Sequence, residues 1–168
     1  MFDLEKIKLD LKNNLSKDRY LHSIRVGELA YELAKIYGVN LENAYIAGIL
    51  HDIAKEFNTK DNIRYIFKYN LPKVLLDDVN KKICHAEVGA LVAKDLYDVN
   101  DDIVDAIKYH TIGNKNMNTL AKIVFVADKI ESGKDYPGID KERILAYKCA
   151  VVNDVRPNLR KKLCGMIQ

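Results

Sequence analysis

Apolar residues recur every three or four positions along most of the chain, which is the pattern of helices that bury one face. The runs begin after Ser, Asp or Asn and end before Gly or Pro, residues typical of helix ends. The expected helices lie at about residues 4–15, 17–37, 41–54, 59–71, 81–97, 101–112, 120–131 and 140–152. No stretch shows the sustained alternation with Gly or Asn turns that marks strands, so the sequence predicts an all-α protein.

The chain has 168 residues, 48% of them hydrophobic, which is enough for one domain with its own core. The polar connection at residues 71–80 is too short to separate two domains. We therefore expect a single domain over residues 1–168, in which a last helix runs from about residue 140 toward residue 168.

Charge and cysteine content exclude several classes of protein. The 27 Lys and Arg residues are mixed with 24 Asp and Glu residues, and a net charge of +3 is too weak to indicate nucleic acid binding. No apolar run approaches the roughly 18 residues of a membrane span. The three cysteines lie far apart without a CxxC pair, which argues against a disulfide framework or a zinc ribbon. These features predict a cytoplasmic protein that binds neither nucleic acid nor membranes.

All four histidines fall on or beside the apolar faces of different expected helices, and two aspartates interrupt similar faces. These residues are His22, His51, Asp52, His85, His110 and Asp128. An imidazole or carboxylate in apolar surroundings needs a hydrogen bond, a counter-charge or a metal ion. Each histidine alone is ordinarily a hydrogen-bonded core or surface residue, but six such positions together favour a metal site. A set of imidazoles and carboxylates without thiolate suits iron or manganese better than a structural zinc.

The order of these residues, H…HD…D, resembles the HD-domain superfamily of metal-dependent phosphohydrolases. Longer segments within about residues 15–140 are similar to one bacterial branch, the symmetrical diadenosine tetraphosphate hydrolases. The segments are RYLHSIRV from Arg19, AGILHDIAK from Ala47, HAEVGA from His85, AIKYHTIG from Ala106 and FVADKIE from Phe125. The resemblance implies a single-domain HD-type helical bundle.

The resemblance also implies roles for the six residues. The primary metal ligands would be His22, His51, Asp52 and Asp128, with Asp52 placed to bridge to a second ion that His85 and His110 serve. The resemblance favours iron, as one ion or a pair, with manganese as the alternative. Two cations lower the pKa of a bridging water and neutralise a phosphoryl oxygen. The implied reaction is attack of a metal-bound hydroxide on diadenosine tetraphosphate to give two ADP, with Asp52, His85 and His110 as catalytic residues.

Further residues are placed to contact the substrate. Lys55, one helical turn after His51, and the Thr111 hydroxyl could hold phosphate oxygens, and Lys134 could close over them from a loop. A solvated surface position is the alternative for both lysines. Arg25, one turn after His22, can instead pair with an acidic neighbour. The substrate-binding set is completed by His22, His85, His110 and Asp128.

The chain departs from the branch at Ser132 and Lys134, where Pro and Arg are expected, and in the segment from Val151 onward, near which the nucleoside is expected to rest. The alternatives are another HD hydrolase of nucleoside polyphosphates or alarmones, and a non-enzymatic nucleotide-binding module. Alarmone hydrolases carry an HDxxED pattern, and Lys55 stands in its first acidic place. The Gly-Tyr-Pro signature of cyclic-dinucleotide phosphodiesterases does not follow His110. A homodimer is compatible with the sequence.

Overall fold

A computed structural model describes residues 2–77 and 80–151. Helices are the only regular secondary structure in these ranges, which confirms the expected all-α class. The elements are α1 (Leu4–Asn14), α2 (Lys17–Tyr37), α3 (Leu41–Leu50), α4 (Thr59–Lys68), the 3₁₀ helix η1 (Lys73–Leu76), α5 (Lys81–Tyr97), α6 (Asp101–Tyr109), α7 (Thr119–Ile130) and α8 (Ile139–Val151). The expected extension of the last helix beyond residue 151 lies outside the described residues.

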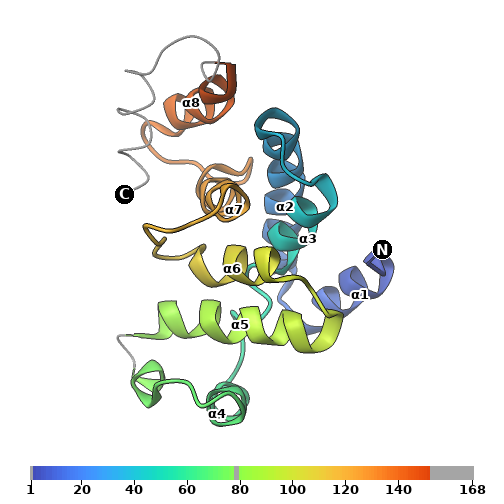
Figure 1. Cartoon of the computed structure of the whole chain (residues 1–168), viewed down its shortest axis with the longest axis vertical. Helices are drawn as coiled ribbons and strands as arrows, with labels where there is room; N and C mark the ends of the chain where they lie inside the picture. The colour runs from blue at the N-terminus through green and yellow to red at the C-terminus, as the bar shows by residue number, and fades with distance from the viewer. Residues whose placement is uncertain (1, 78–79, 152–168) are drawn as a thin grey trace.

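The central helices are α2, α3, α5, α6 and α7 (Figure 1). α2 packs most extensively against α3, and α7 lies against both α2 and α6. α6 in turn packs on α5, while α4 covers the opposite side of α5 and α8 contacts α2 and α7 at the other end of the bundle (Figure 1). None of the described helices is long and apolar enough to cross a membrane.

Side-chain caps fix the beginnings of the helices, because the first backbone N–H groups of a helix have no partner within it. Ser16 accepts a hydrogen bond from the backbone of Arg19, and Asn40 accepts one from the backbone of Asn43. Asn100 caps α6 in the same way. These are the capping positions that the sequence pattern indicates.

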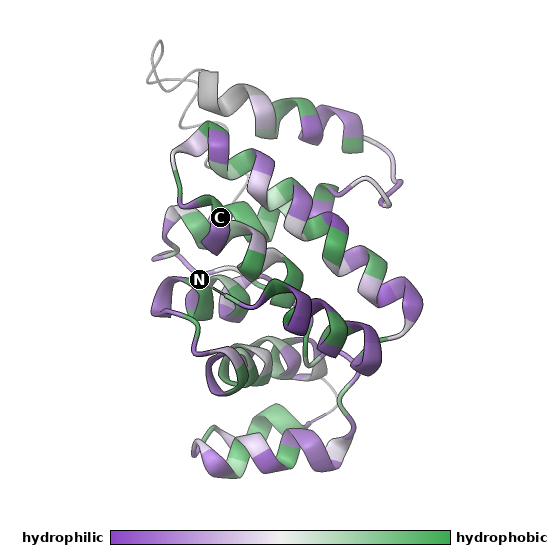
Figure 2. Cartoon of the chain, turned by 90° about the vertical axis from the view of Figure 1, so that its right-hand side faces the viewer, coloured by the Kyte–Doolittle hydropathy of each residue, from purple (hydrophilic) through white to green (hydrophobic). Residues whose placement is uncertain are grey.

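The hydrophobic core lies between the central helices, and hydrophobic and hydrophilic residues alternate along them (Figure 2). Fully buried side chains of the core include Val26, Leu33, Ile46, Ile107 and Val124. The apolar helix faces on which the histidines were expected therefore form this core. Cys84, whose pKa is raised by burial, is a buried free thiol.

Two glycines let α2 and α3 approach very closely. A Cβ atom on Gly48 would lie 2.6 Å from the Cα of Gly27, and a Cβ on Gly27 would lie 2.4 Å from the Cγ2 of Ile49. Neither position accommodates a larger side chain unless the helices move apart. The crossing brings the helix of His22 against the end of the helix that precedes His51.

The expected helix at residues 41–54 ends earlier in the structure, at Leu50. Beyond it the backbone forms tighter turns, in which Ile53 N–H donates to the Leu50 carbonyl and Lys55 N–H donates to the Asp52 carbonyl. The Nδ1 of His51 lies 2.7 Å from the Gly48 carbonyl oxygen, one of the carbonyls that the last turn of α3 leaves open. The helical extension to Ala54 was therefore wrong, because the pattern of apolar residues continues where the backbone hydrogen bonding changes.

Candidate metal centre

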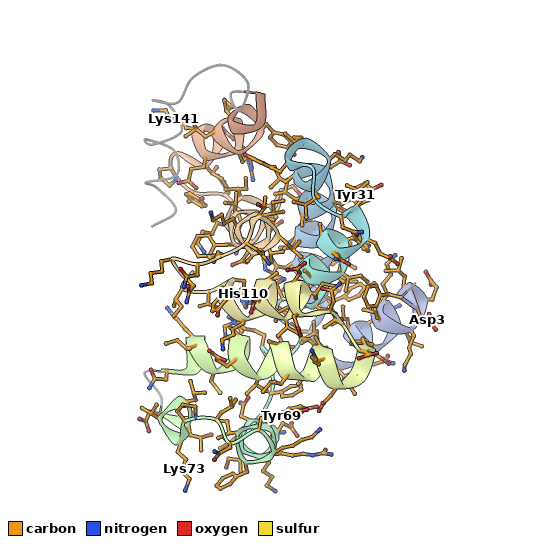
Figure 3. The ribbon with its side chains drawn as sticks, in the orientation of Figure 1. Asp3, Tyr31, Tyr69, Lys73, His110 and Lys141 are labelled. Carbon is orange, nitrogen blue, oxygen red and sulfur yellow. The ribbon has the colours of Figure 1, made fainter. Side chains whose placement is uncertain are left out.

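The four histidines and two aspartates meet in one place, which we call the His/Asp cluster. His22 comes from α2, His51 and Asp52 follow α3, His85 comes from α5, His110 follows α6, and Asp128 comes from α7. All except Asp128 are buried, with exposed fractions of 5% or less. His110 lies in the middle of the molecule (Figure 3). The structure thus brings together every metal ligand that the sequence predicts.

His22, His51 and Asp52 form one group whose candidate ligand atoms lie within 4.8 Å of one another, the first triad. The Nε2 atoms of His22 and His51 are 3.2 Å apart. The Oδ2 of Asp52 lies 3.4 Å from His51 Nε2. Asp128 approaches this triad from α7, and its Oδ1 lies 3.1 Å from His22 Nε2 and 3.6 Å from His51 Nε2.

Asp52, His85 and His110 form the second triad, within the same limit of 4.8 Å. The Oδ1 of Asp52 lies 3.2 Å from His85 Nε2 and 3.4 Å from His110 Nε2. The two imidazole Nε2 atoms are themselves 3.2 Å apart. Asp52 is shared, with one carboxylate oxygen toward each triad.

Three of the imidazoles are anchored through Nδ1 and direct Nε2 toward the cluster. His51 Nδ1 donates to the Gly48 carbonyl at 2.7 Å, and His110 Nδ1 donates to the Ile107 carbonyl at 2.6 Å. His22 Nδ1 faces the carboxylate of Glu131 at 3.2 Å. A ring that carries its proton on Nδ1 presents the Nε2 lone pair to a metal, and such outer contacts fix the tautomer.

The contacts within the cluster fit a bound divalent cation. In two pairs of imidazoles the Nε2 atoms lie only 3.2 Å apart. Two lone pairs or two protons at this distance repel each other, so each pair needs a shared proton or a cation between its nitrogens. Among the described residues, the buried Oδ1 of Asp52 has no partner in hydrogen-bond geometry, although two imidazoles lie near it. Buried polar atoms are nearly always satisfied. Nitrogen and oxygen donors in this number suit a divalent metal ion.

The charges of the cluster support the same interpretation. Burial acts to raise the pKa of Asp52, but the charge of His51 and the close imidazole nitrogens outweigh it and hold this pKa well below its ordinary value. The pKa of Asp128 is lowered against burial by His22 and His51. Burial acts to lower the pKa of His51, yet the two carboxylates raise it to about 10, whereas burial lowers the pKa of His110. The cluster therefore pairs two carboxylates with a cationic imidazole whose Nε2 proton a metal ion could replace.

Two of the expected substrate contacts lie beside the second triad. The Nζ of Lys55 is 3.1 Å from His85 Nε2 and 3.8 Å from Asp52 Oδ1. The Thr111 hydroxyl oxygen is 3.1 Å from His110 Nε2 and 3.4 Å from His85 Nε2. Lys55 is exposed and Thr111 is partly exposed, so both stand where the cluster meets solvent.

The third expected contact, Lys134, lies in the turn after α7. Its backbone N–H donates to the Glu131 carbonyl, and its own carbonyl accepts from Arg143. Among the contacts of the described residues, none joins the Lys134 ammonium to the His/Asp cluster. Its role in phosphate binding stays a prediction.

Sequence reasoning missed two residues that contact the cluster. Arg19 donates from Nη1 to Asp52 Oδ2 at 2.8 Å. Glu131 is buried beside His22 and pairs with Arg25, which confirms the expected acidic neighbour of that arginine. Arg19 precedes His22 by three positions and Glu131 follows Asp128 by three, so helical spacing could have placed each near a ligand.

Comparisons with known proteins agree with this geometry. The HD domain family matches residues 19–133, a range that contains the whole cluster. The symmetrical bis(5'-nucleosyl)-tetraphosphatase of Bacillus subtilis (strain 168) is 41% identical over 138 residues, which cover 81% of this chain and 73% of that protein. The protein of the same name from Staphylococcus aureus (strain NCTC 8325 / PS 47) is 38% identical over 146 residues, covering 86% and 75%.

A solved structure is similar over nearly the whole length. It is the crystal structure of a predicted HD superfamily hydrolase involved in NAD metabolism from Clostridium acetobutylicum. The TM-score is 0.80 at 32% sequence identity, and the match covers 99% of this chain and 89% of the other. The helical arrangement that carries the cluster is therefore found in an experimental structure.

Proposed function

The chain belongs to the HD domain family, and from this premise we propose that it is a metal-dependent hydrolase that cuts diadenosine tetraphosphate symmetrically into two ADP. The observation that carries the proposal is the position of Asp52, whose two oxygens face two histidine pairs. This arrangement can hold two cations side by side. The relatives from Bacillus subtilis and Staphylococcus aureus, which bear the name of this activity, support the substrate.

The residues of the cluster would hold the metal in two groups. The first ion would be bound by His22, His51, Asp52 and Asp128, and a second by Asp52, His85 and His110. We propose iron, as one ion or a pair, with manganese as the alternative, because the donors are imidazoles and carboxylates. When bound, such ions lower the pKa of water and neutralise phosphoryl oxygens.

The protein's own residues orient the reacting groups. Asp52, His85 and His110 are the catalytic residues in this proposal, because their ligand atoms face one another within 3.4 Å at the second triad. The fixed Nδ1 contact of His110 prevents its ring from turning away. These contacts prepare the geometry before substrate arrives, so little reorganisation is needed during the reaction.

Cationic and hydroxyl groups beside the second triad bind the tetraphosphate. The Lys55 ammonium and the Thr111 hydroxyl both lie within 3.4 Å of His85 Nε2, and both residues are accessible to solvent. A phosphate oxygen at this position would accept hydrogen bonds from both. Lys134 would approach the phosphates from the turn after α7 once substrate is bound.

The proposal also covers location and assembly. We place the protein in the cytoplasm, in keeping with Cys84 as a buried free thiol. It acts on a small nucleotide, and we propose a homodimer as its assembly. The exposed apolar side chains of Phe67 and Val74 are candidate positions for such a contact. Light scattering coupled to size-exclusion chromatography measures the assembly directly.

Product analysis in ¹⁸O-labelled water tests the reaction. The iron-loaded protein should convert diadenosine tetraphosphate into ADP alone, with one labelled oxygen in the terminal phosphate of one of each two ADP molecules. Attack at one phosphorus breaks the central anhydride bond, and the second ADP retains the bridging oxygen. Asp52→Ala should form no product, whereas Asp95→Asn, which removes a carboxylate paired with Lys68 away from the cluster, should remain active. AMP with ATP, or no product, would overturn the proposed reaction.

A further inference from the structure

Glu131 is a buried carboxylate to which the proposed reaction assigns no role. It follows the last residue of α7 and is 1% exposed. A carboxylate at such a position loses its hydration, so it is retained only where charges and hydrogen bonds compensate for the loss. The residues that contact the Glu131 carboxylate indicate its role.

One carboxylate oxygen of Glu131 is held firmly, and the other faces a metal ligand. Oε2 accepts hydrogen bonds from Arg25 Nε at 2.5 Å and from the Gly133 backbone N–H at 2.6 Å. Oε1 lies 3.2 Å from His22 Nδ1. Glu131 therefore links the guanidinium of Arg25 to the imidazole of His22.

The turn after α7 is built around this contact. A Cβ atom on Gly133 would lie 2.5 Å from Nη2 and 2.7 Å from Cζ of Arg25, so the guanidinium packs directly against the glycine backbone. Arg143 donates to the carbonyls of Ile130 and Glu131 at 2.9 Å each. Glu131 thus has little freedom to leave His22.

The position of His22 within α2 explains why its Nδ1 needs a side chain as hydrogen-bond acceptor. His51 and His110 follow the last residues of their helices, where the backbone carbonyls three residues earlier accept the Nδ1–H bonds. His22 lies inside α2, where the preceding carbonyls are engaged in the helix itself. An acceptor for its Nδ1 must therefore come from another element.

We propose that Glu131 is a positioning residue that fixes His22 with its proton on Nδ1 and thereby sets the affinity of the first triad for metal. This inference rests on the metal centre proposed above. A carboxylate on the far side of a ligating imidazole orients the ring and strengthens its Nε2 as a donor. Arg25 and Gly133 act on His22 only indirectly, because they hold the Glu131 carboxylate in place.

Metal affinity tests the inference independently of turnover. Mn²⁺ binding to the full chain, measured by competition with a chromophoric chelator, should weaken about tenfold or more in Glu131→Gln, which keeps an acceptor but loses the charge. Glu131→Ala, which loses both, should weaken it further. Glu87→Gln removes a carboxylate paired with Lys108 on the cluster-bearing helices and is the matched control, with affinity expected within about twofold of the unaltered protein.

A second measurement separates positioning from a structural role. Nitrogen-15 NMR of the histidine rings in the metal-free protein should show the proton of His22 on Nδ1, and this preference should weaken in Glu131→Ala while its circular dichroism remains helical. Unchanged Mn²⁺ affinity together with an unchanged His22 tautomer in both variants would overturn the inference. If the unaltered protein bound no Mn²⁺ or Fe²⁺, the metal centre itself would fail, and the NMR result would still decide whether Glu131 orients His22.

Discussion

His51 and His110 hold their imidazole rings in the same way at the ends of two different helices. Each Nδ1 donates to the carbonyl three residues earlier, at 2.7 Å in His51 and 2.6 Å in His110. The ring centroids lie 4.9 Å apart with an interplanar angle of 83°. Each triad therefore contains one candidate ligand whose ring is held by a backbone carbonyl, and Asp52 belongs to both triads.

Gly48, at the crossing of α2 and α3, should tolerate an added methyl group far less well than Gly89 in α5. Gly48→Ala should destabilise the metal-free protein by about 1–3 kcal/mol, because the added Cβ would lie 2.6 Å from the Cα of Gly27. Gly89→Ala adds the same methyl group inside α5, where the nearest atom is 3.4 Å away. The better helix propensity of alanine should make this change neutral or stabilising by about 0.5–1 kcal/mol. Urea unfolding measures both, and equal losses would contradict the close contact.

The pKa of His51 predicts how metal binding depends on pH. In the metal-free protein Asp52 and Asp128 raise this pKa to about 10 against burial, so the ring is protonated at neutral pH. Metal binding needs the free lone pair and must release this proton. The affinity should therefore rise about tenfold per pH unit as pH increases from roughly 7 toward the raised pKa. Chelator competition with Mn²⁺ between about pH 7 and 8.5 measures the slope, and an affinity independent of pH would contradict the protonation of His51.

Arg19 should matter for stability chiefly when metal is absent. Its guanidinium contacts the buried Oδ2 of Asp52 at 2.8 Å. Arg19→Gln should lower the free energy of unfolding of the metal-free protein by about 1–3 kcal/mol, because the buried carboxylate loses a charged donor. A bound cation supplies the missing charge, so the loss should shrink when Mn²⁺ is added. Thermal unfolding with and without Mn²⁺ measures the difference. A loss that metal leaves unchanged would mean that Arg19 stabilises the fold by other contacts.

Lys55 should affect substrate and metal in opposite directions. Lys55→Met should raise the KM for diadenosine tetraphosphate about tenfold, which corresponds to about 1.4 kcal/mol of lost binding. The same change removes a cation 3.1 Å from His85 Nε2, so metal binding at the second triad should become equal or stronger.

Lys134→Met is the matched comparison for this variant, because the Lys134 ammonium is not joined to the cluster among the described contacts. Its KM should change less than that of Lys55→Met. Steady-state kinetics and chelator competition measure the two quantities. Weaker metal binding in Lys55→Met would show that Lys55 supports the metal site instead of the phosphates.

Most helices and all six cluster residues could be predicted because they depend on spacing along the chain. An apolar face with period 3.6 places His22 and Asp128 inward whatever their partners are. The end of α3 at Leu50 could not be predicted, because the apolar pattern continues through Ala54 while hydrogen bonding changes at His51.

The contacts of Arg19 and Glu131 were missed for a different reason. Arg19 meets Asp52 across 33 positions of sequence, and Glu131 meets His22 across 109. Such pairs depend on how helices are placed relative to one another, and periodicity carries no information on that placement. Spacing does show that a charged residue one helical turn from a cluster residue, such as Arg19 or Glu131, can lie close to the cluster.

The close approach of Gly27 and Gly48 also bears on how closely His22 and His51 face each other. His22 lies a little more than one turn from Gly27, and His51 lies just after the turn that contains Gly48. The spacing of these helices, together with the Nδ1 contacts of the two rings, fixes the gap of 3.2 Å between the two imidazole nitrogens. A methyl group at either glycine would push the helices apart and widen this gap, although every candidate ligand would remain in the chain.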